Sequence, residues 1–402
     1  MRIAQLTKEY SPNGGVGRYV TALSRVLDAV GHEVAIVHAD RNAEFGSSSN
    51  IQENYVEAFD AFGGESCKSR VVEVIQILDS FQPDVVLIQG NNNFPLEVEI
   101  RRRFAAIKFL HVYDFCPSGN KFHHASQQTC HHPTGPMCLA RMVYKRCLMT
   151  KRPGVILRHY RRCVEANRNN AEFDRLIVAS DHMKEQAVAS GYAPSQIEVL
   201  PYFTELPPAS PPGDGHTILF LGRIEREKGV DRLFEAVSRM RTQWRLVIAG
   251  DGTDLERAQR RARRLGLSGR VEFLGWVSGE SRSKLFRQAS VVAVPSVWPE
   301  PFGIVGIEAM SHGRPVVAFR VGGVPEWLEH EVSGFIVKPY DVDELAGRLT
   351  YLLDQPLLAQ AMGARGREAA ESRFGRDRHI ARLIGILRNT IETRVCTATC
   401  AG

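Results

Sequence analysis

The first half of the chain alternates short apolar runs with longer segments whose apolar residues recur at helical spacing. The segment 18–30 places Val20, Leu23, Val26 and Leu27 on one helix face, and Gly31 ends that helix. Strands that alternate with helices predict a parallel sheet with helices on both faces. The buried strands expected in this half are 2–7, 33–38, 84–89, 106–111 and 176–180.

In the second half, strands and helices alternate again and more regularly, which predicts a second doubly wound domain. Its expected strands are 216–221, 245–249, 272–273, 291–294, 315–319 and 335–337. Its expected helices are 231–240, 281–288, 304–311 and 342–353. A last helix, at about 379–393, has no strand after it, and such a helix can cross back onto the first domain of a two-domain fold.

A change in composition near residue 207 separates the two halves. The length of 402 residues suits two domains of about 200 residues each. We expect an N-terminal domain at 1–205, a second domain at 206–375, and a C-terminal helix and tail at 376–402. Residues 112–172 do not fit the rhythm and are interpreted as an insertion with helical parts. The hinge-like linker is marked by Pro207, Pro208, Pro211, Pro212, Gly213 and Gly215.

Composition places the chain among soluble globular proteins, with 44% hydrophobic and 24% charged residues. The apolar run at the start ends at Lys8 and Glu9, too early for a signal peptide. No window approaches the roughly 18 to 20 apolar residues of a membrane span. A cytoplasmic protein is the expectation.

The net charge of +6 is unevenly distributed. Residues 141–168 hold nine Lys or Arg and one acid, Glu165, and three arginines at 101–103 add a second basic cluster. Solvated helix faces fit this pattern, and so does an anionic partner such as a phospholipid surface or a phosphate-bearing acceptor. Nucleic acid is disfavoured, because stacking aromatic residues do not interleave with the basic ones.

Four of the eight cysteines crowd into the insertion together with four histidines. The C-x-x-C spacing usual in zinc ribbons is absent there, and a secreted disulfide framework is not indicated. A structural metal site and inert, buried thiols both stay open. The candidate ligands are Cys116, Cys130, Cys138 and Cys147.

The first chemical motif, F-L-G-R-I-E-R-E-K-G, follows the strand at 216–221. That strand ends at Gly222, at the carboxyl edge of the expected sheet, where open α/β folds bind ligands. Arg223 and Lys228 stand five residues apart in the following loop and can both reach one diphosphate. Solvated surface charges are the competing interpretation.

The second motif, P-S-V-W-P-E-P-F-G-I-V-G-I-E-A, occupies residues 295–309. A loop of turn-forming residues leads into a helix near Gly303, whose unpaired N–H groups suit a phosphate or sugar hydroxyls. Glu300 lies in the loop and Glu308 in the helix. One carboxylate can therefore accept from ribose hydroxyls while the other lies near a transferred sugar.

In this order the motifs resemble glycosyltransferase family 4, a large retaining group of the GT-B fold. The second half carries F-L-G-R-x-x-x-x-K-G, A-G-D-G, F-L-G, E-P-F-G-x-x-x-x-E-A and G-G-V-P-E, and the first half carries G-G-V-G-R-Y. The resemblance implies two doubly wound Rossmann-like domains facing each other across a cleft. It also implies sugar transfer from a nucleotide-diphosphate donor, with no metal and no cofactor.

The resemblance further implies residue roles. Arg223 and Lys228 grip the donor diphosphate, Glu300 contacts the donor sugar and Glu308 binds the ribose. His111 ends a first-domain strand, where related enzymes place a histidine near the donor sugar; a structural histidine is the alternative. The family usually has aspartate directly after that histidine, so the role of Asp114 is open. The other donor-binding positions are Gly14, Gly15, Gly222, Trp276, Val277, Phe302, Gly303 and Ile304.

The implied acceptor is a sugar, a glycolipid or a lipid-linked molecule, in polysaccharide or glycolipid assembly. A nucleotide-sugar epimerase of the same fold would need an acid/base set that the sequence does not reveal. An NAD oxidoreductase is disfavoured, because Val20 occupies the third glycine position after Gly15 and Gly17. A non-catalytic nucleotide-sugar-binding protein is disfavoured by the intact basic pair and both glutamates.

Overall fold

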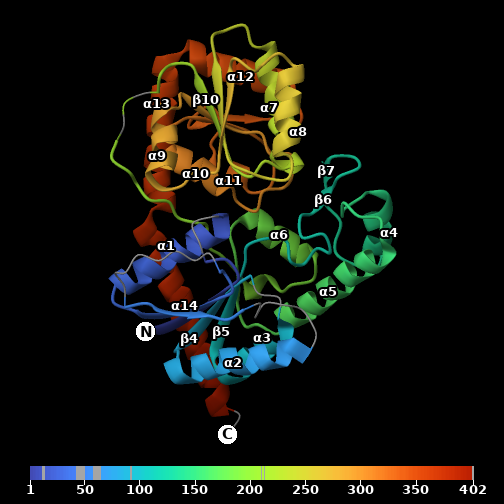
Figure 1. Cartoon of the computed structure of the whole chain (residues 1–402). Coiled ribbons are helices and arrows are strands. Elements are labelled where there is room, and N and C mark those ends of the chain that lie inside the picture. Colours follow the sequence, from blue (N-terminus) through green and yellow to red (C-terminus); the bar gives the residue numbers. More distant parts are fainter. Residues whose placement is uncertain are drawn as a thin grey trace. The chain divides into compact units, whose positions relative to one another are not determined.

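The chain forms two compact units in a computed structural model (Figure 1). Unit 1 comprises Met1–Ser126, Cys130–Pro201 and His379–Gly402, and unit 2 comprises Gln127–Thr129 and Tyr202–Arg378. The structure describes residues 1–10, 14–41, 50–57, 65–90, 93–209, 211 and 213–400, and for 65–68 and 397–400 it describes the backbone alone.

Unit 1 is built on a parallel sheet that has seven strands in its described residues, in the order β3-β2-β1-β4-β5-β8-β9. The central strands are buried along their whole length, which explains why they read as continuous apolar runs. The strands are β1 (Arg2–Thr7), β2 (Glu33–His38), β3 (Gln52–Tyr55), β4 (Val85–Gln89), β5 (Ala105–Leu110), β8 (Leu176–Val178) and β9 (Ile197–Val199). This confirms the parallel sheet expected from the sequence.

The helices of unit 1 connect these strands. The strand expected to run to residue 180 stops at Val178, because Ser180 caps the next helix and its Oγ accepts from the Met183 N–H at 3.1 Å. The connecting helices are α1 (Gly15–Ala29), α2 (Glu65–Phe81), α3 (Phe94–Arg103) and α6 (Asp181–Ala189), with a 3₁₀ turn at Pro194–Gln196.

Residues 112–172, expected to be an insertion with helical parts, contain a short hairpin and two helices. They are β6 (Phe122–His123), β7 (Gln128–Thr129), α4 (Met137–Tyr144) and α5 (Pro153–Ala171). The end of α5 is fixed by a buried polar cluster in which the Lys108 ammonium donates to both Glu97 carboxylate oxygens and to Asn170 Oδ1, each at 3.0 Å. The start of α5 packs against α4 (Figure 1).

The last helix, α14 (Arg376–Cys400), belongs to unit 1 from His379 onward. The His379 Nδ1–H donates to the Pro201 carbonyl at 2.8 Å, and His379 Nε2 accepts from the Tyr19 hydroxyl at 3.0 Å. Ile380, Leu383 and Leu387 are buried. This helix is therefore an integral layer of unit 1.

Unit 2 has a second parallel sheet, six-stranded in its described residues, in the order β12-β11-β10-β13-β14-β15. The strands are β10 (Thr217–Leu221), β11 (Arg245–Ala249), β12 (Val271–Gly275), β13 (Val291–Val294), β14 (Val316–Phe319) and β15 (Gly334–Val337). The helices are α7 (Val230–Arg239), α8 (Leu255–Arg264), α9 (Gly279–Gln288), α10 (Ile304–Ser311), α11 (Val324–Trp327), α12 (Val342–Asp354) and α13 (Pro356–Phe374), with a 3₁₀ turn at Arg226–Lys228.

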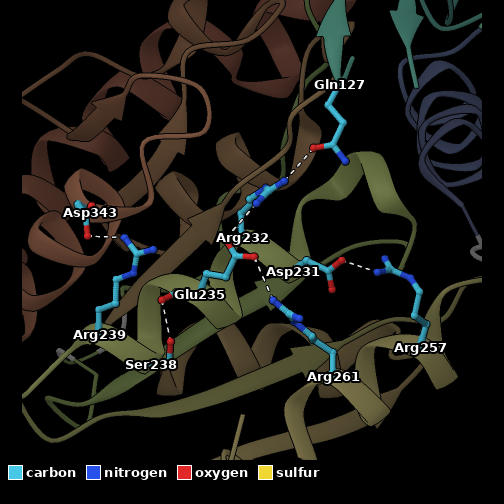
Figure 2. Close-up of polar contacts among 9 residues, drawn as sticks. All are labelled: Gln127, Asp231, Arg232, Glu235, Ser238, Arg239, Arg257, Arg261 and Asp343. Atoms are coloured by element: carbon cyan, nitrogen blue, oxygen red, sulfur yellow. Dashed lines mark hydrogen bonds and ion pairs between the residues drawn. The ribbon is translucent and has the colours of Figure 1, made fainter. Parts of the chain in front are cut away.

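Charged side chains hold the outer side of α7 to its neighbours (Figure 2). Asp231 pairs with Arg257 of α8, Glu235 accepts from Arg261 at 3.3 Å, and Arg239 pairs with Asp343 of α12. Because α7 begins two residues after Lys228, this network also fixes the loop that carries Lys228. Each pair is part-exposed, so the individual contributions to stability are about 1 kcal/mol or less.

Candidate active site

Three loops meet at the carboxyl edge of the unit 2 sheet, where the neighbouring strands β10, β13 and β14 end. The loop after β10 carries Lys228, whose ammonium donates to Glu300 Oε1 at 2.6 Å from the loop after β13. The Val297 N–H donates to the Glu227 carbonyl at 2.8 Å, and the Gly323 N–H donates to the Glu300 carbonyl at 2.8 Å. The topology thus brings Lys228 and Glu300, 72 residues apart, into one polar cluster.

Glu300 is almost completely buried, yet it is held as a carboxylate. Burial alone raises the pKa of this carboxyl. The positive charge of Lys228 and hydrogen bonds from Lys228, Ser296 and Trp298 outweigh burial, so the pKa lies below its ordinary value. The same Lys228 ammonium lies 5.1 Å from the centre of the Trp298 ring, a cation–π contact. The cluster therefore keeps a half-buried positive charge and a buried negative charge together.

Two glycines give this edge its shape. Gly303 has a left-handed backbone (φ +99°) and caps α10 without a side-chain hydrogen bond. The first N–H groups of that helix therefore have no side-chain cap, as at an anion-binding helix start. Gly322 (φ +52°) lies so close to Glu300 that an added Cβ would stand 2.1 Å from the Glu300 carbonyl oxygen. A side chain at residue 322 would therefore displace the backbone of Glu300.

Arg223 is exposed just past the end of β10, beyond Gly222. Within the part of the chain that the structure describes, it makes no hydrogen bond or ion pair. The two cations of the first motif thus differ, because Lys228 is paired inside the cluster while the Arg223 guanidinium faces solvent. Phe302 and Ile304 flank Gly303 at the start of α10, as the motif predicted.

Glu308 lies on α10, apart from the Lys228 cluster. Its carboxylate accepts a hydrogen bond from Arg282 of α9, and both side chains are nearly buried. Its backbone carbonyl is 2.8 Å from His312 Nδ1. Arg282 is a neighbour that the sequence analysis did not single out, because nothing in the motif indicates which part of α9 faces α10.

Trp276 and Val277 follow β12 at the same edge of the sheet, and the Trp276 side chain is 42% exposed. A cavity of about 620 Å³ lies between α9 and strands β10, β11 and β12. Val277 lines it, but its other walls include Thr217 and Arg245 at the opposite ends of the strands. The cavity therefore follows the face of the sheet and does not contain the Lys228–Glu300 cluster.

The predicted residues of unit 1 lie at the carboxyl edge of its own sheet. Gly14 precedes α1 as its N-cap, again without a side-chain hydrogen bond, and Gly15 is the exposed first residue of that helix. His111 directly follows β5, as expected, and is 5% exposed. Its ring stacks on Phe109 at 4.3 Å between ring centres.

A chain of buried hydrogen bonds fixes the His111 ring. Gln89 Nε2 donates to Gln5 Oε1 at 2.9 Å, and Gln5 Nε2 donates to Ser24 Oγ at 2.8 Å. Gln89 Oε1, 2.8 Å from His111 Nε2, is then the acceptor, so His111 carries its proton on Nε2. Burial lowers the pKa of His111 to about 3, so the ring is neutral at physiological pH.

Sequence reasoning missed Gln89 as the partner of His111 and Gln5 as the partner of Gln89. A signal was present, because Gln5 stands between apolar residues of β1 and Gln89 ends the otherwise apolar β4, and both lie in buried parts of their strands. It missed Ser296 as well, although Ser296 lies four residues before Glu300 in the same motif. Asp114 is near Lys108 and Arg162; burial raises the pKa of its carboxyl, and these two charges oppose that effect.

The four candidate cysteines of the insertion are all described by the structure. Among the described residues, no group of three or more Cys, His, Asp or Glu side chains is arranged to hold a metal ion. Burial, assisted by the neighbouring thiols, raises the pKa of Cys147 to about 12, so this thiol is protonated near neutral pH. The Cys147 Sγ instead contacts the Arg141 carbonyl at 3.6 Å.

None of the helices in the described ranges combines the length and the apolar character needed to cross a bilayer.

In a comparison with known proteins, each half of the chain matches a family model. The family described as Glycosyltransferase Family 4 matches residues 13–206, and the family described as Glycosyl transferases group 1 matches residues 204–369. The D-inositol 3-phosphate glycosyltransferase of Mycolicibacterium paratuberculosis is 34% identical over 239 residues, which are 55% of this chain and 54% of that relative. The chain spans between 34% and 56% of the length of the first curated relatives that it matches.

Solved structures resemble almost the whole chain. Sucrose-phosphate synthase of Thermosynechococcus elongatus has a TM-score of 0.77 at 21% identity, over 98% of this chain and 100% of that one. HepE of Anabaena, solved with UDP and glucose, has a TM-score of 0.73 at 19% identity, over 97% and 100%. At such identities the likeness establishes the fold, which is GT-B. With both halves matched by its family models, the chain belongs to the group 1 glycosyltransferases of family 4.

Proposed function

We propose that this protein is a retaining glycosyltransferase that moves a sugar from a nucleotide-diphosphate donor to an acceptor hydroxyl. The observation that carries the proposal is the cluster at the carboxyl edge of the unit 2 sheet. There, Lys228 and the Glu300 carboxylate lie beside the uncapped start of α10, with Arg223 exposed at the end of β10. This arrangement offers positive charge for a diphosphate and a fixed carboxylate for sugar hydroxyls.

In the proposed reaction, the bond between the sugar C1 and the diphosphate oxygen breaks. The acceptor oxygen forms a new bond to C1 on the same face. The acceptor's proton passes to an oxygen of the departing phosphate, so no protein base is needed. Lys228, Arg223 and the N–H groups at the start of α10 stabilise the negative charge that builds on the diphosphate.

Glu300 and His111 have positioning roles in this proposal. Because Glu300 is ionised and held by Lys228 and Ser296, it accepts hydrogen bonds from donor hydroxyls and does not deliver a proton. With a pKa of about 3, the His111 ring is a poor proton acceptor near neutral pH. We therefore assign His111 a hydrogen-bonding contact with the donor sugar.

The remaining assignments concern the nucleoside and the acceptor. Trp276 and Val277, past the end of β12, are proposed to lie against the base, and Glu308, oriented by Arg282, to bind the ribose. Gly14 and Gly15 at the start of α1 are proposed to approach the phosphates. HepE is described with UDP-glucose and a related enzyme acts on D-inositol 3-phosphate. We propose a UDP-sugar donor, and an acceptor used in glycolipid or polysaccharide assembly.

The test is a thermal-shift panel of UDP, GDP and ADP and their glucose conjugates, with the wild type and the Arg223→Ala variant. A nucleotide present at about a hundred times its dissociation constant adds about 2.7 kcal/mol of stability. One nucleotide should stabilise the wild type and stabilise the variant much less. Stabilisation by NAD, or by none of these ligands, would contradict the proposal.

Product analysis tests the reaction itself. NMR of the glycoside formed from an α-linked donor should show an α-anomer, and excess EDTA should leave the rate unchanged if no metal takes part. An inverted product would refute the retaining mechanism. A new nucleotide sugar with no glycoside would favour an epimerase, and donor binding without turnover would favour a binding protein.

A further inference from the structure

We propose that the segment 137–161 of unit 1, called here the arm, is a docking surface for an anionic phospholipid bilayer. The arm consists of α4, the turn after it and the first half of α5. It lies where α5 packs against α4, at the opposite end of α5 from its anchor on α3 (Figure 1). The proposal goes beyond sugar transfer and is tested without measuring it.

The arm has a small hydrophobic core of its own. Met142, Cys147 and Ile156 are buried together, and Leu139, Leu148 and Tyr160 pack against them. Met142 and Leu139 therefore define the inner face of α4. This core holds the two helices together, so the rest of the α4 surface is not needed for the packing of the arm.

The outer face of α4 is also apolar, which is unusual for a surface helix. The sequence of α4, M-C-L-A-R-M-V-Y, has one charged residue in eight. Met137 and Tyr144, two turns apart, are 61% and 62% exposed, and Val143 beside them is 53% exposed. A helix that is apolar all round is normally buried in a core or in a membrane. Met149 and Leu157, elsewhere in the arm, are 67% and 39% exposed.

Unpaired positive charge occurs in the same segment as these exposed apolar side chains. No acidic residue occurs between residues 137 and 161, and within the described residues the exposed cations of the arm make no ion pair with a carboxylate. These cations are Arg146, Lys151, Arg152, Arg158 and Arg161. Helix α8 of unit 2 is a useful contrast: its Arg257, Arg260 and Arg261 each pair with an acidic side chain.

A segment that combines exposed apolar side chains with unpaired cations matches the interface of an anionic leaflet. The apolar groups enter the boundary of the acyl chains while the cations remain among the headgroups. The Lys145 ammonium lies 5.5 Å from the centre of the Tyr144 ring, so this pair joins an interfacial aromatic to a cation. The aliphatic character of Met137, Val143 and Met149 separates the arm from a nucleic-acid surface, where aromatic stacking is expected.

The experiment is flotation of the full chain with vesicles of phosphatidylcholine alone and of phosphatidylcholine mixed with phosphatidylglycerol. We expect binding to the anionic vesicles and none to the neutral ones. Binding should weaken in about 1 M salt, where the Debye length is about 3 Å. Equal binding to both vesicles, or binding to neither, would overturn the proposal.

Matched variants locate the surface. Arg146→Gln/Lys151→Gln/Arg152→Gln should weaken binding by about fivefold for each charge removed. Val143→Ser/Tyr144→Ser should weaken it at low and at high salt. The controls Arg263→Gln/Arg264→Gln on α8 and Leu357→Ser on α13 remove comparably exposed groups from unit 2 and should bind like the wild type. Equal losses in arm and control variants would refute the assignment.

Two measurements distinguish bilayer docking from misfolding and from general polyanion binding. Circular dichroism and the nucleotide-induced thermal shift should be unchanged in all variants, so a misfolded arm or a failed donor site would be recognised independently of lipid binding. Duplex RNA serves as a competitor. If it displaces the vesicles and Val143→Ser/Tyr144→Ser has no effect, the surface recognises polyanions in general and the bilayer proposal is wrong.

Discussion

The polar clusters at the carboxyl edges of the two sheets differ in charge, although both sheets are parallel and doubly wound. In unit 2 the edge holds ionised groups: Lys228 with Glu300, and Arg282 with Glu308. In unit 1 the corresponding edge holds a neutral relay from His111 through Gln89 and Gln5. Burial disfavours the charged form of both groups. Glu300 stays ionised because a cation lies beside it, whereas His111 faces an amide and stays neutral.

This contrast indicates that the two edges have different roles in ligand binding. The unit 2 edge keeps positive charge available for an anionic ligand. Each of its two carboxylates is ionised and paired with a cation. The unit 1 edge presents hydrogen-bonding groups whose protonation does not change near neutral pH. A shared topology thus supplies two loop clusters at equivalent places, and the side chains decide which of them holds charge.

The largest expected effect comes from separating Lys228 and Glu300. Lys228→Met should lower turnover by about 10²- to 10³-fold, because it removes charge opposite the developing diphosphate. It should also reduce the free energy of unfolding by up to about 3 kcal/mol, because Glu300 is left buried without its cation. Enzyme assays and denaturant titration measure the two effects.

A double-mutant cycle separates the two roles of Lys228. Lys228→Met/Glu300→Gln should recover much of the lost stability, because no unpaired charge remains, but it should recover no activity. Recovery of turnover in the double variant would show that Lys228 only compensates Glu300. Wild-type activity in Lys228→Met would remove this cluster from the proposed mechanism.

Acid should weaken unit 1 before unit 2. Burial lowers the pKa of His111 to about 3 and, despite the opposing hydrogen bond to Pro201, the pKa of His379 to about 4. Between those values and about 6.5 the unfolded chain binds more protons, so stability falls as pH falls. At pH 5 the loss is about 2 kcal/mol for each of these histidines.

Hydrogen exchange read by mass spectrometry at pH 7 and pH 5, corrected for intrinsic rates, resolves the two units. Peptides of β1, β4, β5 and α14 should lose protection first. His379→Gln, which cannot titrate, should reduce the acid sensitivity of unit 1. Earlier opening of the peptides of β10 and β13 would reverse the comparison.

A smaller effect is expected at Arg223. Within the described residues its guanidinium has no partner to lose. In the absence of nucleotide, the melting temperature of Arg223→Ala should therefore differ from that of the wild type by no more than about 1 °C. Donor affinity should fall by about tenfold, which isothermal titration with the nucleotide diphosphate would measure. Arg226→Ala, three residues further along the same loop, is the matched control and should bind the donor like the wild type. A change in stability without a change in affinity would assign Arg223 to the fold.

The smallest expected effect comes from placing a carboxylate beside His111 in unit 1, as a cation lies beside Glu300 in unit 2. Gln89→Glu places a carboxylate against His111 Nε2, and an adjacent negative charge should raise the pKa of His111 by about 1 to 3 units. NMR titration of the imidazole protons measures this shift, with His182, whose pKa burial lowers to about 4, as the internal control. An unchanged His111 pKa would mean that burial alone governs the ring.

Most strands could be predicted from the sequence because each is a short, fully buried apolar run. The expected strands 2–7, 33–38, 245–249 and 291–294 coincide with β1, β2, β11 and β13. The elements without such a signal were not predicted. Strand β3 reads Q-E-N-Y and lies at the edge of its sheet, where burial imposes little pattern.

Helices α8 and α13 of unit 2 escaped prediction for different reasons. Helix α8 buries two alanines, Ala258 and Ala262, and otherwise reads as charge, so it lacks an apolar stripe. Helix α13 contains Gly363 and Gly366, which normally argue against a helix. An added Cβ at Gly363 would stand 2.0 Å from the Gly313 carbonyl oxygen. The glycine is therefore needed for close packing, which becomes apparent only in the tertiary structure.

The candidate site shows the same limit. The motifs singled out Lys228, Glu300 and Glu308 as candidates, because each lies in the segment that follows the carboxyl end of a strand. They did not reveal that Glu300 binds Lys228 or that Glu308 binds Arg282. Such pairs depend on the packing of loops and helices far apart in sequence, and one-dimensional spacing carries no information about it.

The place of α14 has a consequence for synthesis of the chain. Unit 2 is almost continuous in sequence, whereas unit 1 needs its last helix, which follows all of unit 2. During translation unit 2 can close as soon as Arg378 has left the ribosome. Unit 1 must wait with the surface that later receives Ile380, Leu383 and Leu387 uncovered. If translation ended just before residue 379, the released chain would have a complete unit 2, but unit 1, most of which is made first, would lack its last helix.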